Sequence, residues 1–417
     1  MRAALLFLIL LALFAGPVAK SAGGGGPEPA LVALECFADT AADPCQGVPH
    51  PSLELAAGVA VSPDGRSVYV AASEEEPAGL GSDAITEFTR DTDGQLHPTG
   101  CLTFSGGRGC RAGRIPLEGV RRLVVTADGR NVYALADDGI AEFARGGAGR
   151  LRPIGCLAFD TEGPGTSRCK HPEGGFETDM IGLAASPDGD DLYVSAGNYV
   201  ARSAADKFVG RLFEFSRRPD GTLATIGCLG PTPRSRCLKI GTGELREPVV
   251  TDDGRALYAV EDDSLLRFPR WREGLLGRPE CVLGHSSRCA RSQGAPAPSY
   301  RSVAVSADGS SLYLGTTKET IAYSVSPDGA LTRIASRRIP SYALALAPDG
   351  SRLYGTASTG ITTFVTGEGT LSPSGTPFPV TGAEGIAVTP DGSALLVASW
   401  WQSDLLVLSP NTKEPVP

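Results

Sequence analysis

An Asp-Gly dipeptide that follows an apolar run and precedes a second run with a large side chain recurs seven times in this 417-residue chain. The aspartates of these dipeptides are Asp64, Asp128, Asp188, Asp253, Asp308, Asp349 and Asp391. The fifth residue after each aspartate is Tyr69, Tyr133, Tyr193, Tyr258, Tyr313, Tyr354 and, in the seventh repeat, Leu396. Six of the ten tyrosines occupy one repeat position, which indicates seven copies of one structural unit.

Each repeat has the pattern of a four-stranded antiparallel sheet. An apolar strand meets the Asp-Gly hairpin turn, and a tyrosine-bearing strand returns from it. A third strand carries a phenylalanine in five repeats, at Phe88, Phe143, Phe215, Phe268 and Phe364. A further glycine turn opens the fourth strand, at Gly94, Gly149, Gly221, Gly329 and Gly369. With 53 glycines and 32 prolines, the chain favours turns and short strands over long helices.

The two ends of the chain predict how the repeats close. A leucine followed five residues later by a cysteine marks the fourth strand, as in Leu96/Cys101, Leu151/Cys156, Leu223/Cys228 and Leu276/Cys281. The same pattern precedes the first repeat at Leu31/Cys36, and the seventh repeat stops after three strands near Leu408. The N-terminal strand should therefore complete the last sheet and remove its open edge. We predict an all-β, seven-bladed β-propeller as a single domain over residues 28–410, with an open solenoid as the alternative.

The N-terminus has the pattern of a targeting segment. Met1 and Arg2 precede an apolar run over Ala3–Ala15, which is too short to span a bilayer but typical of a signal peptide. We predict a signal peptide over residues 1–22, a Gly-rich linker over 23–27 and a C-terminal tail over 411–417; a retained N-terminal anchor is the alternative. No later run of 18 apolar residues occurs, so we expect no membrane span after signal removal and a secreted, extracytoplasmic protein.

The ten cysteines support this location. They form five close pairs along the chain: Cys36/Cys45, Cys101/Cys110, Cys156/Cys169, Cys228/Cys237 and Cys281/Cys289. Sequence alone does not determine connectivity, but the repeated spacing favours five local disulfides and hence an oxidising compartment. The alternative is zinc binding, for which cysteine pairs are usually separated by only two to four residues.

Composition and charge exclude several functions. A formal net charge of −9 argues against nucleic acid as a partner, since a nucleic-acid binder needs a basic face. Only four histidines are present, so we expect no histidine-rich metal centre and no bound metal. The chain contains no Walker loop, zincin motif or serine nucleophile elbow, and we expect no cofactor and no redox or nucleotide chemistry.

One end of the predicted ring should carry the variable loops. The inter-blade loops, the loops between second and third strands and the starts of the first strands share this end, while the Asp-Gly turns occupy the other. The long insertions fall on it: Ser73–Asp83, Arg111–Gly119, Lys170–Met180, Asn198–Val209 and Arg291–Ser299. Because binding residues usually lie on variable loops over a rigid frame, we expect this loop-rich face to be functional.

Seven residues before each Asp-Gly turn lies the predicted mouth of the central channel. These positions hold Ala57, Arg121, Ile181, Arg246, Arg301, Tyr342 and Glu384, and the following positions add Arg122 and Glu247. Arg121, Arg246 and Arg301 would converge there and could hold a carboxylate or phosphate. The alternative is that these charges neutralise one another around a water-filled funnel.

A few aromatic and histidine side chains complete the candidate site. Trp400 and Trp401 lie in a loop of the same face and could stack on a sugar or anchor a partner, or else plug the channel edge, whereas Trp271 should pack. His171 and His50 are candidate acid-base groups on loops of the same face. A solvated histidine without a catalytic role is the alternative for His171, and also for His50, His97 and His285.

The repeats GVAVSPDGRSVYVAAS, GLAASPDGDDLYVSAG and SVAVSADGSSLYLGTT resemble the YVTN-type repeat of bacterial β-propellers and are similar to lactonase-like seven-bladed propellers. The cysteine loops GCLTFSGGRGC, GCLGPTPRSRC and ECVLGHSSRC resemble a secreted actinobacterial branch of that group. The resemblance covers roughly residues 28–410 and rests on turns and core strands. It implies a propeller and, from phosphogluconolactonase-type members, lactone hydrolysis at a polar channel mouth without a nucleotide cofactor. It transfers no catalytic residue to this chain.

Two functions follow as hypotheses. The first is a secreted, disulfide-bonded monomer that binds an unknown protein or a small anionic or carbohydrate ligand at the loop-rich face. Its candidate ligand-binding residues are Arg121, Arg122, Arg246, Arg301, Tyr342, Glu384, Trp400 and Trp401. The second is an extracellular lactone hydrolase, in which the arginines would hold a carboxylate or a developing oxyanion and Glu384 or Glu247 would activate water.

Overall fold

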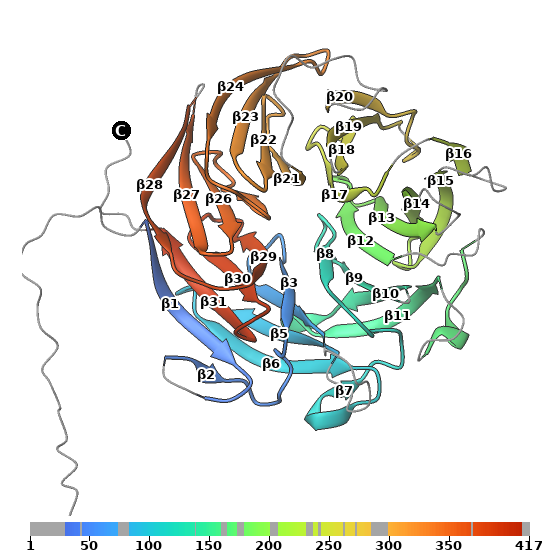
Figure 1. Ribbon diagram of the computed structural model, residues 1–417. Coiled ribbons are helices and arrows are strands. Elements are labelled where there is room, and N and C mark those ends of the chain that lie inside the picture. The colour runs from blue at the N-terminus through green and yellow to red at the C-terminus, as the bar shows by residue number, and fades with distance from the viewer. Residues whose placement is uncertain are drawn as a thin grey trace, which may run out of the picture.

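The computed structural model is a ring of seven β-sheets around a central axis (Figure 1). It describes residues 30–41, 44–73, 83–137, 139–159, 165–172, 179–200, 207–230, 237–240, 243–261, 263–271, 273–284, 299–367 and 370–410. The all-β fold and the count of seven blades are as predicted. The predicted signal peptide, linker and C-terminal tail, together with His285, lie outside the described residues.

Each blade contains four strands, with the first strand nearest the axis. Blade 1 has β3 (Ala56–Val61), β4 (Ser67–Ala72), β5 (Ala84–Arg90) and β6 (Leu96–Thr103). Blade 2 has β8 (Arg122–Val125), β9 (Asn131–Ala136), β10 (Gly139–Arg145) and β11 (Leu151–Ala158). Blade 3 has β12 (Asp179–Ala185), β13 (Asp191–Val200), β14 (Lys207–Arg217) and β15 (Leu223–Gly230).

The remaining blades follow the same order around the ring. Blade 4 has β17 (Arg246–Val250), β18 (Ala256–Glu261), β19 (Ser264–Pro269) and β20 (Glu280–Gly284). Blade 5 has β21 (Tyr300–Val305), β22 (Ser311–Thr316), β23 (Thr320–Val325) and β24 (Leu331–Arg337). Blade 6 has β25 (Leu344–Leu346), β26 (Arg352–Ala357), β27 (Gly360–Gly367) and β28 (Thr370–Phe378). Short 3₁₀ turns occur at Gly107–Gly109, Gly147–Gly149 and Thr166–Arg168.

Blade 7 joins the two ends of the chain, as predicted. It contains β29 (Ala383–Val388), β30 (Leu395–Ser399), β31 (Asp404–Pro410) and the N-terminal strand β1 (Leu31–Ala38). Strand β1 runs antiparallel to β31, from the pair Leu31 and Pro410 to the pair Ala38 and Asp404. The ring therefore closes through hydrogen bonds between residues separated by most of the sequence, and β31 has no open edge.

The Asp-Gly turns have one local chemistry in most repeats. In blade 1, the Ser62 hydroxyl donates to Asp64 Oδ1 at 2.5 Å, and the Arg66 N–H donates to the same oxygen at 3.1 Å. Gly65 has a φ of 67°, a conformation that glycine adopts without steric cost. The aspartate oxygen thus stabilises the turn, and Oδ2 remains available for another partner.

The repeated tyrosines join neighbouring blades. Their side chains are buried, and the Tyr69, Tyr133 and Tyr193 hydroxyls donate to the carbonyls of Gly149, Gly221 and Gly274 in the following blade, at 2.5, 2.7 and 2.7 Å. A tyrosine at this position therefore supplies both apolar contact area and an inter-blade hydrogen bond.

Four of the five predicted disulfides lie within the described residues: Cys36–Cys45, Cys101–Cys110, Cys156–Cys169 and Cys228–Cys237. Cys281 is also disulfide-bonded, and its predicted partner Cys289 lies outside the described residues. Three cysteine loops add a short parallel strand to the outer edge of a blade, namely β2 (Gln46–Gly47), β7 (Arg111–Ala112) and β16 (Cys237–Lys239). The disulfides agree with an oxidising, extracytoplasmic compartment. In the described part of the chain, no helix is long and apolar enough to cross a membrane.

Two local predictions were wrong. The segment Asn198–Val209 was expected to be a loop insertion, but its two ends extend β13 and β14, with Asn198 opposite Val209. Leu276 was expected to lie in a fourth strand. It forms only an isolated bridge with Arg270, and β20 begins at Glu280. Neither difference changes the order of the blades.

Candidate functional site

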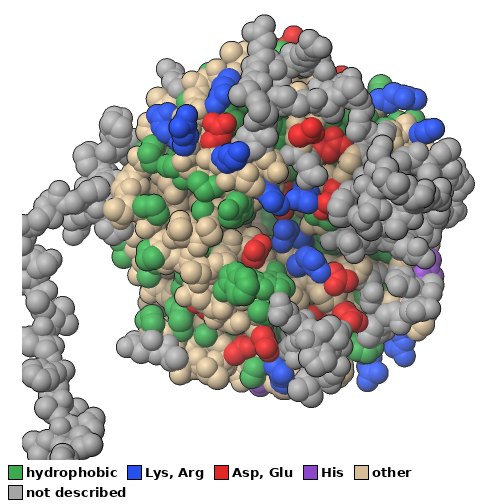
Figure 2. All heavy atoms as spheres, in the orientation of Figure 1, with side chains coloured by type: hydrophobic (Ala, Val, Ile, Leu, Met, Phe, Trp, Pro, Cys, Tyr) green, Lys and Arg blue, Asp and Glu red, His purple; other side chains and the backbone are tan. Residues whose placement is uncertain are grey.

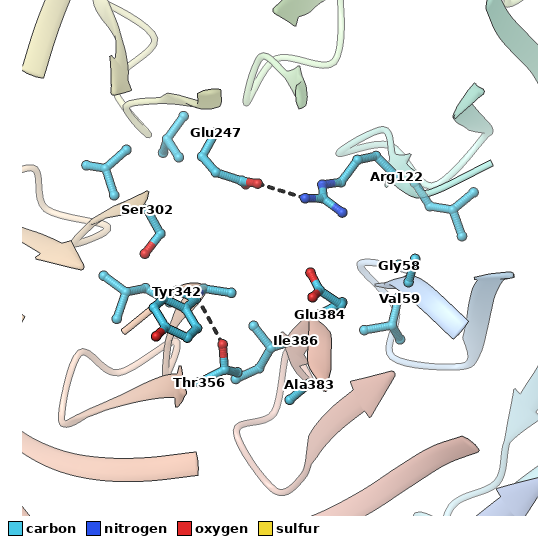
Figure 3. A pocket seen from close by; sticks show the side chains of 17 residues that line it. Gly58, Val59, Arg122, Glu247, Ser302, Tyr342, Thr356, Ala383, Glu384 and Ile386 are labelled. Atoms are coloured by element: carbon cyan, nitrogen blue, oxygen red, sulfur yellow. Dashed lines mark hydrogen bonds and ion pairs between the residues drawn. The ribbon is translucent and has the colours of Figure 1, made fainter. Parts of the chain in front are cut away.

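A cavity of about 200 Å³ lies at the centre of the ring, between the first strands of six blades (Figure 3). Its lining comes from blades 1, 2, 4, 5, 6 and 7: Ala57, Gly58, Val59, Arg122, Leu123, Glu247, Val249, Ser302, Val303, Tyr342, Ala343, Leu344, Thr356, Ala383, Glu384, Gly385 and Ile386. The walls are mostly small or apolar, so the few polar side chains among them determine what the cavity can bind.

β-Bulges at the entry of the first strands place these polar groups. The strand pairing skips one residue at Ala57, Arg301 and Glu384, while Arg121 and Arg122 both lie opposite Leu135. A bulge bends the strand and changes the direction of the side chains on either side of it. In blades 1, 6 and 7 the lining begins at Ala57, Tyr342 and Glu384, whereas in blades 2, 4 and 5 it begins one residue later, at Arg122, Glu247 and Ser302. A simple count back from the Asp-Gly turn does not reveal this difference.

Arg122 and Glu247 form an ion pair in the cavity wall. The Arg122 guanidinium donates to Glu247 Oε1 at 3.0 Å and joins blade 2 to blade 4 across the front of blade 3. Glu247 lies in a bulge between the paired residues Arg246 and Val249, and its φ is 44°. A non-glycine residue in this left-handed region is strained by about 1–2 kcal/mol. Such strain is often found at functional sites.

Glu384 and Tyr342 complete the polar lining. The Glu384 side chain is exposed, and its carboxylate makes no hydrogen bond or ion pair with any described residue. Figure 3 shows this carboxylate pointing into the cavity, between Arg122 and Tyr342. Tyr342 is 43% exposed and presents its ring to the same space. With one arginine and two glutamates, the lining has a formal charge of +1 − 2 = −1.

The three arginines predicted to converge do not line this cavity. Arg121 forms an ion pair with Asp137 of its own blade, and Arg246 donates to Glu244 at 3.0 and 2.8 Å. Arg301 makes no ion pair with a described carboxylate, and its buried Nε has no hydrogen-bond partner. Figure 2 shows acidic and basic side chains gathered together around the centre of the ring. For Arg121 and Arg246, the observed arrangement is therefore the local neutralisation that was the alternative prediction.

The predicted aromatic residues lie beside the cavity. Trp401 is 75% exposed and rests on Gly382, where an added Cβ would be 1.9 Å from the indole Cδ1. The Trp400 N–H donates to the Gly382 carbonyl at 2.7 Å, and the Trp400 side chain is half-buried. Since Gly382 directly precedes Ala383 and Glu384, Trp401 lies near the cavity rim. Trp271 was expected to pack but is 63% exposed on blade 4.

None of the three described histidines, His50, His97 and His171, lines the cavity. His171 is exposed beside Cys169, with its Nδ1 3.2 Å from the Ala158 carbonyl oxygen. His97 pairs with Asp91 at 2.9 Å on the outer strand of blade 1. Among the described residues, the one group of His, Cys, Asp and Glu side chains close enough to hold a metal is Cys36, Cys45 and Asp404. Its two cysteines are disulfide-bonded, so it offers no thiolates.

Sequence reasoning found four of the polar lining residues: Arg122, Glu247, Tyr342 and Glu384. It missed Ser302 and Thr356, which have no distinguishing pattern in the sequence. It also missed the partners of the rim arginines. The spacing of Glu244 and Arg246 on one segment was an available signal for a local ion pair, whereas Asp137 pairs with Arg121 only because β9 returns beside β8.

No family model matches the sequence, and no curated protein matches it. Solved structures do match its fold. A candidate 6-phosphogluconolactonase from Bacteroides uniformis has a TM-score of 0.55 at 17% identity, over 81% of this chain and 87% of that chain. A candidate 6-phosphogluconolactonase from Bacteroides fragilis has a TM-score of 0.56 at 17% identity, over 79% and 85%. A Lactobacillus plantarum protein has a TM-score of 0.55 at 14% identity, over 78% and 85%.

At these identities the matches establish the fold alone. The chain is a seven-bladed β-propeller, the architecture of these solved structures, which confirms the fold that the resemblance of its repeats implied. Fold does not determine function, which depends instead on the side chains that line the cavity.

Proposed function

We propose that this protein is a secreted binding protein that holds a small, neutral, hydroxyl-rich ligand, such as a sugar or polyol, in the central cavity. The observation that carries this proposal is the unpaired Glu384 carboxylate, which shares the cavity with the Arg122–Glu247 ion pair. Carboxylate oxygens accept hydrogen bonds from the hydroxyl groups of a ligand, and a guanidinium donates hydrogen bonds to the oxygens of those hydroxyl groups.

The charge and size of the cavity select the ligand class. A lining with a net charge of −1 disfavours an anion, which would have to approach Glu247 and Glu384 together. The cavity volume of about 200 Å³ lies below the roughly 300–1,000 Å³ of pockets for drug-sized ligands. A single sugar ring fits this size better than a chain of several. The exposed rings of Tyr342 and Trp401 offer apolar faces for the C–H surface of such a ring.

Calorimetric titration of the full chain with neutral sugars, polyols, sugar acids and sugar phosphates tests the proposal. We expect binding of at least one neutral compound, and about tenfold weaker binding after Glu384→Gln, which keeps the shape but removes the charge. Asp93→Asn is the matched control, because it makes the same charge change at an exposed turn on the Asp-Gly face. Preferential binding of the sugar acids or phosphates, or equal affinity of the Glu384→Gln and Asp93→Asn variants, would overturn it.

A second candidate function is the hydrolysis of a neutral lactone in the same cavity. It is favoured by an unpaired carboxylate facing a guanidinium. Glu384 would accept a proton from a water as that water adds to the lactone carbonyl, and Arg122 would stabilise the oxyanion that forms. The ring C–O bond then breaks, its oxygen takes the proton, and a hydroxy acid is released.

Turnover distinguishes the two functions. A panel of neutral lactones is incubated with the protein and acid release is followed at constant pH. A rate above buffer that falls after both Glu384→Gln and Arg122→Met supports the hydrolase. Binding of a sugar without any such rate supports the binding protein alone.

A further inference from the structure

The Asp-Gly face carries a contact between blades that recurs at four of the seven junctions. At four junctions an arginine at the end of the third strand of one blade donates to Oδ2 of the turn aspartate in the preceding blade. These pairs are Arg90 and Asp391 at 3.0 Å, Arg145 and Asp64 at 2.8 Å, Arg217 and Asp128 at 2.8 Å, and Arg270 and Asp188 at 2.9 Å. The guanidinium fills the space between the two blades each time, with its side chain mostly buried.

At the junction between blades 4 and 5 the arginine position is occupied by Val325. The strand register shows the equivalence, because the Val325 N–H donates to the Ser310 carbonyl just as the Arg270 N–H donates to the Arg255 carbonyl, both at 2.8 Å. The short apolar side chain of Val325 does not reach Asp253. A groove of about 340 Å³ is open here, lined by Asp253, Tyr258, Val325, Gly309 and their neighbours.

Asp253 also differs from the other turn aspartates in what its oxygens contact. Its Oδ1 accepts from the Thr251 hydroxyl and the Arg255 N–H, as in the other turns, but no described residue donates a hydrogen bond to its Oδ2. The other two junctions without arginine satisfy this oxygen locally, since Ser310 donates to Asp308 Oδ2 and Ser351 donates to Asp349 Oδ2, each at 2.8 Å. Asp253 therefore combines an open groove with an available acceptor.

Two arginines border the groove, but neither occupies the position that Arg270 has at the junction of blades 3 and 4. Arg255 is 84% exposed, and its Nε lies 3.8 Å from Asp253 Oδ2, which is beyond hydrogen-bond distance. Arg267 also lines the groove, where it lies against Gly329, donates to Glu280 at 2.9 Å and forms a hydrogen bond with the Tyr258 side chain. The charge of Arg267 is thus neutralised by its own partner, and Arg255 can move into solvent.

We propose that this groove is a docking site for an arginine side chain presented by a partner protein. The incoming guanidinium would take the position that Arg145, Arg217 and Arg270 hold within the ring. It would donate to Asp253 Oδ2 and to the Gly309 carbonyl, as Arg270 donates to Asp188 and to the Gly254 carbonyl. The planar fork of arginine matches this pair of acceptors, whereas a lysine ammonium does not. The site lies on the face opposite the central cavity, so it is independent of the proposed sugar binding.

The test uses the full chain and the peptide acetyl-Gly-Gly-Arg-Gly-Gly-amide, with the lysine and citrulline peptides as comparisons. We expect saturable binding of the arginine peptide by chemical-shift titration, about tenfold weaker for the lysine peptide and for Asp253→Asn. Val325→Arg should abolish binding by supplying the guanidinium from within the chain. Arg255→Ala should preserve or tighten it, because the neighbouring positive charge is gone.

One variant should gain a second binding site for the arginine peptide, a result that a general loss of structure cannot produce. Arg145→Val places at the junction of blades 1 and 2 the residue that blade 5 carries naturally, and it should create a second site with Asp64 as acceptor. Asp349→Asn is the matched control for Asp253→Asn, since Ser351 already covers Asp349. Equal binding of the arginine and citrulline peptides, or unchanged binding after Val325→Arg in a folded protein, would overturn the proposal. If Val325→Arg does not fold, Asp253→Asn against Asp349→Asn decides it.

Discussion

Glu142 lies directly opposite Gly155 in the β10–β11 ladder, and the carboxylate extends over the glycine to accept a hydrogen bond from Leu223 N–H of the next blade at 2.9 Å. The same cross-strand pair recurs as Glu87 with Gly100 and Glu214 with Gly227. Those carboxylates accept from the N–H groups of Leu151 and Leu276. The Gly-Cys dipeptides in the fourth strands therefore have a structural reason, because a side chain at the glycine would occupy the space of the carboxylate.

These buried carboxyls make stability depend on pH. Burial raises the pKa of Glu142 and of Glu214 to about 7, from an ordinary value of 4.5. A carboxyl whose pKa is higher in the folded state stabilises the fold when protonated, and this contribution is lost as pH rises from about 4.5 through 7. We expect the free energy of unfolding to fall by a few kcal/mol between pH 5 and pH 8. Urea unfolding across this range measures it, and Glu142→Gln with Glu214→Gln should flatten the profile.

Gly155→Ala adds only one methyl group, but it should destabilise the protein strongly. An added Cβ would lie 2.2 Å from Glu142 Oε2, so the carboxylate would have to leave Leu223 N–H and the inter-blade hydrogen bond would break. We expect a loss of about 1–3 kcal/mol in the free energy of unfolding. Gly147→Ala is the control, because a Cβ there meets nothing within 4 Å. Equal effects of the two substitutions would show that the Glu142 contact contributes nothing.

Arg270→Met should be among the most damaging substitutions on the Asp-Gly face. The Arg270 side chain is 6% exposed and donates to Tyr193 Oη at 2.7 Å, to Asp188 and to Asp191, whose side chain is 7% exposed. Removing the guanidinium leaves the Asp191 carboxylate buried without its partner, which costs about 3–5 kcal/mol. Thermal unfolding compares this variant with Arg255→Ala, an exposed arginine whose loss should change stability by less than about 0.5 kcal/mol. Similar melting temperatures for the two variants would contradict the assigned inter-blade role.

Glu247→Gly and Glu247→Gln separate backbone strain from ligand binding. Both remove the ion pair with Arg122, but only glycine adopts the φ of 44° without steric cost. We expect Glu247→Gly to be more stable than Glu247→Gln by about 1 kcal/mol, while both bind the cavity ligand less well than the unsubstituted chain. Chemical unfolding and sugar titration of the same two variants check both parts. A glycine variant less stable than the glutamine variant would mean that Glu247 is not strained.

The architecture could be predicted because its determinants are short-range and repeated. Each Asp-Gly turn is stabilised by neighbouring residues, as with Ser62, Asp64 and Arg66, and the cysteine pairs are joined over separations of 9 to 13 residues. The pairing of β1 with β31 is long-range, but the matching of Leu31/Cys36 to the other fourth strands revealed it. Seven weak signals in one register are stronger evidence than any of them alone.

The tertiary structure determines which side chains line the cavity and which blade junctions contain an arginine. In a strand, successive side chains alternate between faces, and a bulge of one residue shifts that alternation. In the folded ring Arg122 and Glu247 lie in the cavity wall, while Arg121 and Arg246 pair with Asp137 and Glu244. Similarly, Val325 is an unremarkable strand residue in the sequence. Its position beside Asp253 of the preceding blade shows that this junction lacks the guanidinium found at four others. The sequence does not reveal this, because the two residues belong to different sheets whose spacing is set by the closed ring.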